Sequence, residues 1–291
     1  MALTPGRESS FEALRGRLFG IAYRMLSSRV ETEDMVQEAY IRWHQADRTS
    51  ILNPEAWLVA TTTRLAIDRL RVLKTERESY TGPWLPEPLL HQPPAPDYAA
   101  ELASDLSIAF LVLLERLGPE ERAAFLLHDV FERRYDEIAG TLGKTEAACR
   151  QMIHRARERV RNHQTRYAAT EADKTQLLQQ FVSAVEARDD KALLGLFAPD
   201  ATWTPDGGGK TPAAPQPIVG AERIVSLILG LQRIFVQRSG KFEPVSVNGE
   251  PGLLLRLDGE TAGILAFDDD GITIRNAYIV LNPDKLPAIQ K

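Results

Sequence analysis

Hydrophobic side chains recur at intervals of three and four residues over residues 11–79, which is typical of amphipathic helices. Asn53 and Pro54 predict a helix start, because asparagine caps free N–H groups and proline fits the first helical position. The helix that follows has a predicted core stripe (Ala56, Ala60, Thr63, Ile67, Leu70) and a polar, mostly basic stripe (Thr61, Arg64, Asp68, Arg71). The preceding helix has one polar face, formed by Asp34, Gln37 and Glu38. By spacing alone, both polar faces suit either a binding surface or plain exposure to solvent.

A second helical pattern covers residues 105–167, and its last part has the proportions of a helix-turn-helix. Gly118-Pro119 predicts a helix start, and a short helix over Tyr135–Leu142, a turn at Gly143-Lys144 and a longer helix capped by Thr145 follow. The longer helix has an inward seam (Cys149, Ile153, Ala156, Val160) and an outward face (Arg150, Gln151, His154, Arg155). Arginine and glutamine match base edges in the major groove, so this pattern predicts DNA reading. The alternative is an ordinary three-helix unit with a solvated basic face.

The pattern changes from about residue 170. An amphipathic helix, a second helix, a strand over Ala201–Thr204 and a helix over Ala221–Phe235 precede four β-prone segments. The last segments are separated by hairpin turns at Asn248-Gly249, Asp258-Gly259 and Asp270-Gly271. Helices followed by an antiparallel meander predict an α+β cone wrapped around a pocket.

The overall charge and composition say little about function, but one segment has a charge of its own. The 291 residues carry a net charge of −5, which by itself argues against nucleic acid. However, residues 141–167 contain seven basic side chains (Lys144, Arg150, Arg155, Arg157, Arg159, Arg161, Arg166) against Glu146 and Glu158. The single Cys149 excludes an internal disulfide framework and suits a reducing cytoplasm. We expect no signal peptide and no membrane span, because the N-terminus and the longest apolar runs are unsuited to either.

Candidate chemistry is sparse. The stretch D-G-G-G-K-T, residues 206–211, resembles the end of a phosphate-binding loop, but Thr204 stands where a glycine is needed and Pro212 would interrupt the following helix. Trp203 and Asp206 could line a pocket that contains an acid, although no partner base can be named. The five histidines form no ligand pair, so we expect no metal and no cofactor. Cys149 lies on the predicted buried seam and is expected in the core.

Residues 81–96 contain six prolines, which is typical of an extended linker. A solvated linker has little use for the apolar side chains that this one carries, which are Trp84, Leu85, Leu89 and Leu90. They predict that the linker docks against a folded surface.

The order of these motifs resembles the extracytoplasmic-function sigma factors, which are promoter-recognition subunits of bacterial RNA polymerase. E-D-M-V-Q-E-A-Y-I-R-W-H resembles their region 2.2, N-P-E-A-W-L-V-A-T-T-T-R-L-A-I-D-R-L-R resembles regions 2.3 and 2.4, and L-G-P-E-E-R-A-A-F-L-L with the helix-turn-helix resembles region 4. The resemblance implies core RNA polymerase and promoter DNA as partners. It assigns Asp34, Gln37 and Glu38 to the polymerase clamp helices, and Thr62, Arg64 and Arg71, with the loop from Gln45 to Asn53, to the −10 element. It assigns the −35 element to Lys144, Thr145, Arg150, Gln151, His154 and Arg155.

A sharper likeness is to the subgroup with a C-terminal SnoaL-like domain. Its signatures W-L-P-E-P, D-G-G-G-K and N-P-D-K-L stand at residues 84–88, 206–210 and 282–286. The likeness implies regulation in cis through an interdomain set comprising Trp84, Leu85, Pro86, Glu87, Pro88, Asp206, Lys210, Asn282, Pro283, Asp284, Lys285 and Leu286. It implies that no separate anti-sigma factor is required. The alternative is a C-terminal domain that works as a small-molecule enzyme or as a sensor of an unknown small ligand.

The expected fold class is multidomain, with two all-α sigma domains, the second containing the helix-turn-helix, followed by an α+β SnoaL-like cone. The expected boundaries are 1–80 for region 2, 81–104 for the linker, 105–167 for region 4 and 168–291 for the SnoaL-like domain. We expect no enzyme activity, no membrane partner and a cytoplasmic location. We expect Trp84 and Leu85 to dock beside residues 282–286, with Lys285 placed to pair with Glu87.

Overall fold

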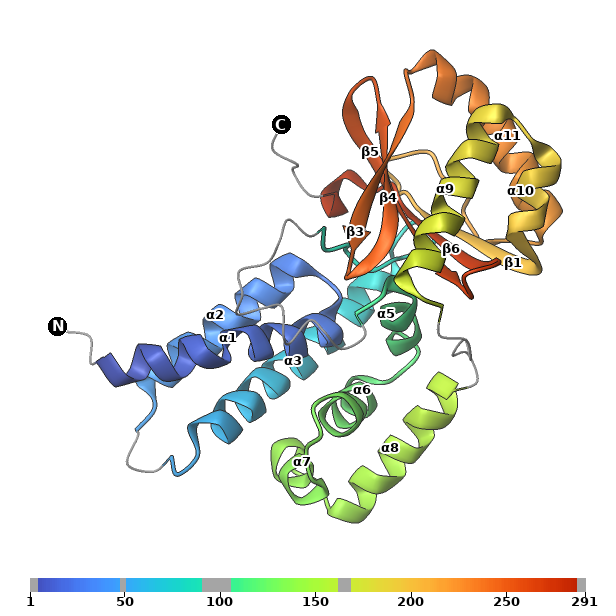
Figure 1. Cartoon of the computed structure of the whole chain (residues 1–291). Helices are drawn as coiled ribbons and strands as arrows, with labels where there is room; N and C mark the ends of the chain where they lie inside the picture. Colours follow the sequence, from blue (N-terminus) through green and yellow to red (C-terminus); the bar gives the residue numbers. More distant parts are fainter. Residues whose placement is uncertain (1–4, 48–50, 91–105, 162–168, 287–291) are drawn as a thin grey trace. The chain divides into compact units, whose positions relative to one another are not determined.

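The computed structural model describes residues 5–47, 51–90, 106–161 and 169–286 (Figure 1). The chain divides into two compact units. The first contains the helices up to residue 78 and those from residue 111 to the end of the helix-turn-helix. The second contains the linker from Ser79, the short segment Ser107–Phe110 and the C-terminal α+β domain.

Three long helices form the first part of the helical unit: α1 (Pro5–Leu26), α2 (Arg29–Gln45) and α3 (Pro54–Glu78). They pack on one another through fully buried side chains that include Leu18, Leu58 and Leu70. The predicted start of α3 is confirmed, because the Asn53 Oδ1 accepts a hydrogen bond of 3.1 Å from the Ala56 N–H. The asparagine thus satisfies one of the donors that a helix leaves free at its first turn.

The second part of this unit is built from the end of α5 (Ile108–Leu114), which belongs to it from Leu111 on, and from α6 (Pro119–Phe125), a π-helical segment (Leu126–Val130), α7 (Tyr135–Leu142) and α8 (Glu146–Arg161). The bounds of α7 agree with the predicted ones. Gly143 ends α7 with a φ of 63°, which a glycine adopts without strain. The Thr145 Oγ1 then caps α8 by accepting from the Ala148 N–H at 3.2 Å. The predicted seam of α8 is confirmed, since Cys149, Ile153, Ala156 and Val160 are all at most 2% exposed.

The predicted stripes of α3 are partly wrong. Thr61, expected on the polar stripe, is buried, and Thr62 and Thr63 are 0% exposed. Three consecutive buried positions cannot lie on one stripe of a helix, so α3 is enclosed over a wider arc there than the sequence pattern predicts. Neighbouring helices from both parts of the unit pack against α3 and provide this cover.

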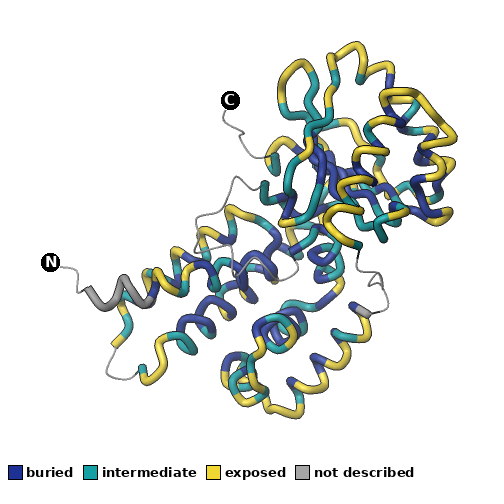
Figure 2. The backbone as a smooth tube through the Cα atoms, in the orientation of Figure 1, coloured by how far each residue is buried: buried dark blue, intermediate teal, exposed yellow. Residues whose placement is uncertain are grey.

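The second unit is an α+β domain. Its elements are α9 (Glu171–Ala187), α10 (Asp190–Leu196), β1 (Phe197–Asp206), β2 (Ile218–Val219), α11 (Ala221–Gln237), β3 (Lys241–Val247), β4 (Glu250–Leu257), β5 (Glu260–Asp269), β6 (Ile274–Val280) and a 3-10 turn (Pro283–Lys285). The sheet order is β2-β1-β6-β5-β4-β3. Figure 1 shows α9, α10 and α11 together beside this sheet. Figure 2 shows the buried residues concentrated on the strands and on the helix faces toward them.

The sheet differs from the predicted meander in one respect. Strands β3 to β6 are antiparallel neighbours, as the hairpin turns predict, but β1 pairs with β6 in parallel and makes the sheet mixed. β1 is also longer than the predicted Ala201–Thr204 and ends at Asp206. This pairing brings the start of D-G-G-G-K beside the chain that leaves β6 for N-P-D-K-L.

Candidate functional site

The carboxylate of Asp206 is the centre of a buried polar cluster in the α+β unit. Asp206 is 0% exposed and ends β1. Its Oδ1 accepts from the Tyr80 hydroxyl at 2.5 Å. Its Oδ2 accepts from the Leu85 N–H at 2.8 Å and from the Lys285 Nζ at 2.7 Å. The linker and the C-terminal turn therefore meet on a single carboxylate.

Lys285 contacts the linker through its backbone and through two aromatic rings. Its Nζ donates to the Leu85 carbonyl at 2.6 Å, and lies 4.2 Å from the centre of the Trp84 ring and 4.9 Å from that of Tyr80. An ammonium held over aromatic faces while it is paired with a buried acid is strongly oriented. Lys285 pairs with the buried carboxylate of Asp206 at 2.7 Å, and its expected pairing with Glu87 stays a prediction.

Tyr80 completes the cluster, and the sequence motifs do not include it. Its hydroxyl accepts from the Asn282 Nδ2 at 2.9 Å while it donates to Asp206. Burial, and then the neighbouring Asp206 carboxylate, raise the pKa of the Tyr80 hydroxyl well above its usual range. Tyr80 therefore stays protonated and acts as a hydrogen-bond donor to Asp206.

The glycines of D-G-G-G-K allow the close approach of these segments. Gly208 has a φ of 58°, and a Cβ added to it would lie 2.4 Å from the Asn282 Nδ2 and 3.0 Å from the Tyr80 hydroxyl. A side chain at this position would therefore displace the two residues that order the cluster. Nothing in the geometry resembles a phosphate-binding loop, because the backbone turns toward other segments of the chain.

The linker has a second anchor at its far end. The Leu89 N–H donates to the Asn248 Oδ1 and the Asn248 N–H donates to the Leu89 carbonyl, both at 2.8 Å. Leu90 forms an antiparallel bridge with Val247 at the end of β3. Between the anchors, Leu85 is 1% exposed and Pro86 and Pro88 are buried, whereas Trp84 is half-buried. The expected docking beside residues 282–286 is thus present, with Leu85 as the buried anchor.

The outward face of α8 is exposed, as its pattern predicts. Arg150, Gln151, His154 and Arg155 are exposed, Thr145 is exposed, and Lys144 is half-buried. Acidic neighbours lie beside several of them: Glu146 is 2.8 Å from Arg150, and Glu120 is 2.9 Å from Lys144. An exposed row of arginine, glutamine and histidine on the second helix of a helix-turn-helix can reach a major groove.

The polar residues of α3 have a different environment. Arg64 donates to the carbonyls of Gly140 and Thr141 at the end of α7, both at 2.8 Å. Arg71 pairs with Glu120 at 2.8 Å. Thr62 is 0% exposed, so its side chain is not accessible in this structure, and its assignment to the −10 element stays a prediction. The reason for its burial is the wide buried arc of α3.

The acidic face of α2 is accessible. Asp34 and Gln37 are exposed, and Glu38 is half-exposed and pairs with Arg42 one turn later at 2.8 Å. Glu38 and Arg42 stand four residues apart, an ordinary surface pairing on a helix. This face of α2 is therefore exposed and accessible to a partner.

A cluster of charged side chains surrounds Glu115, and the sequence pattern does not predict it. The Glu115 carboxylate accepts from Arg122 at 2.8 Å and from Arg77 at 2.6 Å. Arg122 is 0% exposed and also donates to the Met25 carbonyl at 2.7 Å. Burial by itself would raise the pKa of the Glu115 carboxyl, but the two guanidinium groups outweigh it and hold that pKa below its usual range. No periodic pattern could find this cluster, because its members come from α3, α6 and the end of α5.

The described residues offer little for metal or thiol chemistry. No group of three or more potential metal-binding side chains occurs within the described ranges. No helix in the same ranges is long and apolar enough to cross a membrane. Burial raises the pKa of the Cys149 thiol, which fits its place on the α8 seam and not the role of a nucleophile.

The fold and these surfaces define a class of transcription protein, and comparison with known families agrees. Residues 10–75 match the model of sigma-70 region 2 and residues 107–160 match that of sigma-70 region 4. The chain belongs to the extracytoplasmic-function RNA polymerase sigma factors. Its regions 2 and 4 are those that recognise promoters, and its C-terminal domain has the SnoaL-like fold.

Particular relatives extend the likeness over almost the whole chain. The sigma factor SigJ of Mycobacterium tuberculosis is 39% identical over 291 residues, covering 95% of this chain and 92% of the relative. SigI of the same organism is 28% identical over 284 residues, covering 97% and 95%. The crystal structure of SigJ matches with a TM-score of 0.76 and 36% identity, covering 95% of this chain and 97% of that one. The predicted fold class is confirmed.

Proposed function

We propose that α8 reads the −35 element of promoter duplex through Arg150, Gln151, His154 and Arg155, with Lys144 and Thr145 at the turn. The observation that carries this proposal is the exposed row on a capped and firmly seated helix. Bidentate contacts of arginine or glutamine with base edges discriminate bases, whereas a phosphate contact does not.

The acidic face of α2 and the basic residues of α3 complete the initiation machinery in this proposal. Asp34, Gln37 and Glu38 bind the clamp helices of core polymerase. Arg64 and Arg71 hold the −10 strand, and both must first leave their partners on α6 and α7. Promoter opening is then driven by binding energy, and polymerase makes the two weak DNA contacts bivalent.

The docked linker is the element through which the SnoaL-like domain acts in cis. The chain passes from Glu78 at the end of α3 to the docked Tyr80 within two residues. Docking therefore limits how far region 2 can move from the C-terminal domain. Because both anchors are short sets of hydrogen bonds, a partner such as polymerase can rearrange them. This regulation needs no separate anti-sigma factor.

The SnoaL-like domain works by contact and not by turnover. Asp206, the candidate acid, has its carboxylate engaged by three donors and is fully buried, so it is not accessible to a substrate in this structure. The protein is expected to act in the cytoplasm, where core polymerase is found.

Promoter selection tests the DNA assignments. Core polymerase with the full chain would select templates from a library, first with randomised promoters and then with the −35 segment varied. Arg150→Ala should reduce the preference at one base pair by about 5- to 150-fold, which corresponds to ~1–3 kcal/mol. An equal loss on every sequence would mean that Arg150 only contacts phosphate. Asp34→Ala with Glu38→Ala should weaken binding to core polymerase without changing these preferences.

Transcription by the same holoenzyme tests the role of the linker. Trp84→Ala and Asp206→Asn should change transcription in the same direction, and the double variant should be non-additive, because both act on one contact. Additive effects would separate the linker from the C-terminal domain and refute regulation through docking.

A further inference from the structure

The guanidinium of Arg150 has two neighbours of opposite character. The Glu146 carboxylate lies 2.8 Å from its Nη2, one turn earlier on α8. The ring of Tyr135, the first residue of α7, has its centre 4.9 Å from the Arg150 Cζ. Arg150 is therefore held between the two helices of the helix-turn-helix while 58% of its side chain stays exposed.

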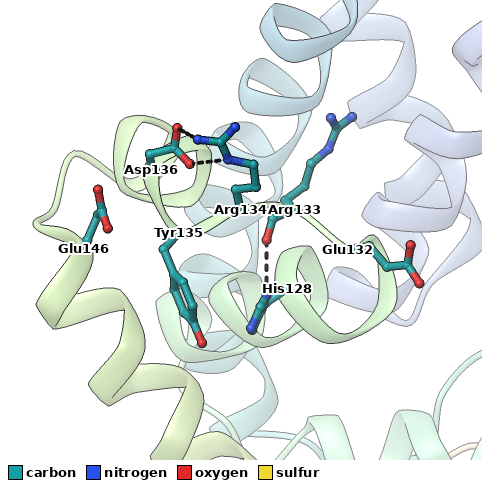
Figure 3. A pocket seen from close by; sticks show the side chains of 7 residues that line it. All are labelled: His128, Glu132, Arg133, Arg134, Tyr135, Asp136 and Glu146. Carbon is teal, nitrogen blue, oxygen red and sulfur yellow. Dashed lines mark hydrogen bonds and ion pairs between the residues drawn. The ribbon is translucent and has the colours of Figure 1, made fainter.

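Tyr135 is itself held in place. Its ring packs against the imidazole of His128, with 4.5 Å between the ring centres and 47° between the planes. The His128 Nδ1 lies 3.1 Å from the Arg133 carbonyl, which fixes the imidazole in turn. Figure 3 shows this arrangement at an open hollow of about 500 Å³, with Glu146 on the neighbouring helix. The Tyr135 ring, at the start of α7, is thus packed against His128 and lies within reach of Arg150.

Glu146 and Tyr135 interact with different parts of the Arg150 guanidinium. A carboxylate uses the N–H groups of a guanidinium, which are the same groups that would meet a guanine edge. Attraction to the face of an aromatic ring uses no N–H donor. Glu146 therefore occupies a donor of the Arg150 Nη2 that a base could otherwise use, whereas Tyr135 occupies none.

We infer that Tyr135 is a positioning residue for base readout, which keeps Arg150 oriented toward one base pair of the −35 element. The inference rests on the proposed reading of that element by Arg150. Tyr135 reduces the number of orientations that Arg150 must lose when it binds, and so acts on discrimination. Glu146 acts on affinity for every sequence, because it competes with any anionic or polar partner.

The experiment uses the full chain with core polymerase and a library of promoter templates randomised across the −35 segment. The variants are Tyr135→Phe, which keeps the ring, Tyr135→Leu, which keeps apolar volume without an aromatic face, and Arg150→Ala. Glu146→Gln is the matched control at the second neighbour of Arg150. Thermal unfolding of each variant accounts for any change in folding.

Tyr135→Leu should flatten the preference at the same base pair as Arg150→Ala, by about 2- to 5-fold, the size of an exposed cation–π contact. Tyr135→Phe should keep the wild-type profile. Combined with Arg150→Ala, Tyr135→Leu should have no further effect at that base pair. Glu146→Gln should strengthen binding to all templates about equally.

Several outcomes would overturn the inference. Tyr135→Leu could leave the profile unchanged, weaken all templates equally, or act at a base pair that Arg150→Ala leaves alone. Each of these, together with a sequence-specific effect of Arg150→Ala, would refute the role of Tyr135 and leave the proposed function intact. An Arg150→Ala variant with a wild-type profile would refute both.

Discussion

Two buried or mostly buried carboxylates, Glu115 in the helical unit and Asp206 in the α+β unit, hold segments of the chain together in different surroundings. Each joins segments that are far apart in sequence, and each accepts hydrogen bonds from cations and other donors that are themselves mostly buried. Glu115 keeps 20% of its side chain exposed and binds two guanidinium groups. Asp206 is 0% exposed and binds one ammonium, one hydroxyl and one backbone N–H.

The difference lies in what can move when the carboxylate is lost. Arg122 sits at 0% exposure inside packed helices and also holds the Met25 carbonyl, so it cannot reach water without opening the core. The donors to Asp206 come largely from a linker that can detach and become solvated. A buried ion pair adds little net stability compared with an apolar pair, but breaking one partner is costly unless the other can escape. Glu115 should therefore govern global stability, and Asp206 a local opening.

The largest expected effect comes from Glu115→Ala. It leaves Arg122 and Arg77 buried without their anion, and should lower the free energy of unfolding of the helical unit by ~3–5 kcal/mol. Urea unfolding followed by circular dichroism would measure it. Glu120→Ala, which removes an acid whose partners Arg71 and Lys144 are more exposed, should cost less than ~1 kcal/mol. Equal losses in the two variants would contradict the distinction.

Asp206→Asn should have a smaller effect on global unfolding and a clear local one. The amide cannot accept from three donors as a carboxylate does, so the linker should open more often, by ~1–3 kcal/mol. Hydrogen exchange at the Leu85 and Asn248 amides, which mark the two anchors, would report this opening. Protection at β4 and β5 should remain as in the wild type. A uniform loss of protection over the whole unit would show that docking and domain folding are one event.

The pH dependence provides a third contrast. The pKa of Glu115 is depressed in the folded state, so its contribution is present above the ordinary carboxyl pKa and is lost as the pH falls through the depressed value. The helical unit should lose stability on acidification over this window, by ~1.4 kcal/mol for each unit of depression. Glu115→Gln should be less stable near neutral pH and should lack this part of the pH dependence. Parallel curves for the two proteins would assign the acid sensitivity to other carboxylates.

The two clusters also show what a sequence can reveal. The helices, the turn at Gly143 and the seam of α8 follow from periodicity and caps, because these are local properties. The apolar side chains of the linker predicted that it docks, but the docking site was located only through the resemblance of three short motifs. These motifs located Asp206, Asn282 and Lys285 but could not pair them. Tyr80 lies outside every motif, although it binds two of these residues.

The Glu115 cluster was beyond reach of the same reasoning. Arg122 falls within a helix where an arginine is normally assigned to solvent, and the packing of neighbouring helices against α6 buries it. The prediction that Thr61 lies on a polar stripe was wrong for a related reason, since tertiary contacts widened the buried arc of α3. In both cases the information lies in which helices meet, which a periodic pattern does not contain.

The smallest expected effect concerns the lysine of D-G-G-G-K. Lys210 pairs with Asp284 at 2.5 Å, but both side chains are more than half exposed, at 55% and 60%. Such a pair in water contributes between nothing and ~1 kcal/mol, and salt screens it. Lys210→Ala should therefore leave hydrogen exchange at the Leu85 amide almost unchanged. Lys285→Ala, the matched change in N-P-D-K-L, removes a lysine that is 12% exposed and leaves Asp206 buried without a counter-ion, so it should release the linker as Asp206→Asn does. If Lys210→Ala released the linker as fully as Lys285→Ala, charge at the rim would control docking, and the buried carboxylate would lose its place at the centre of the site.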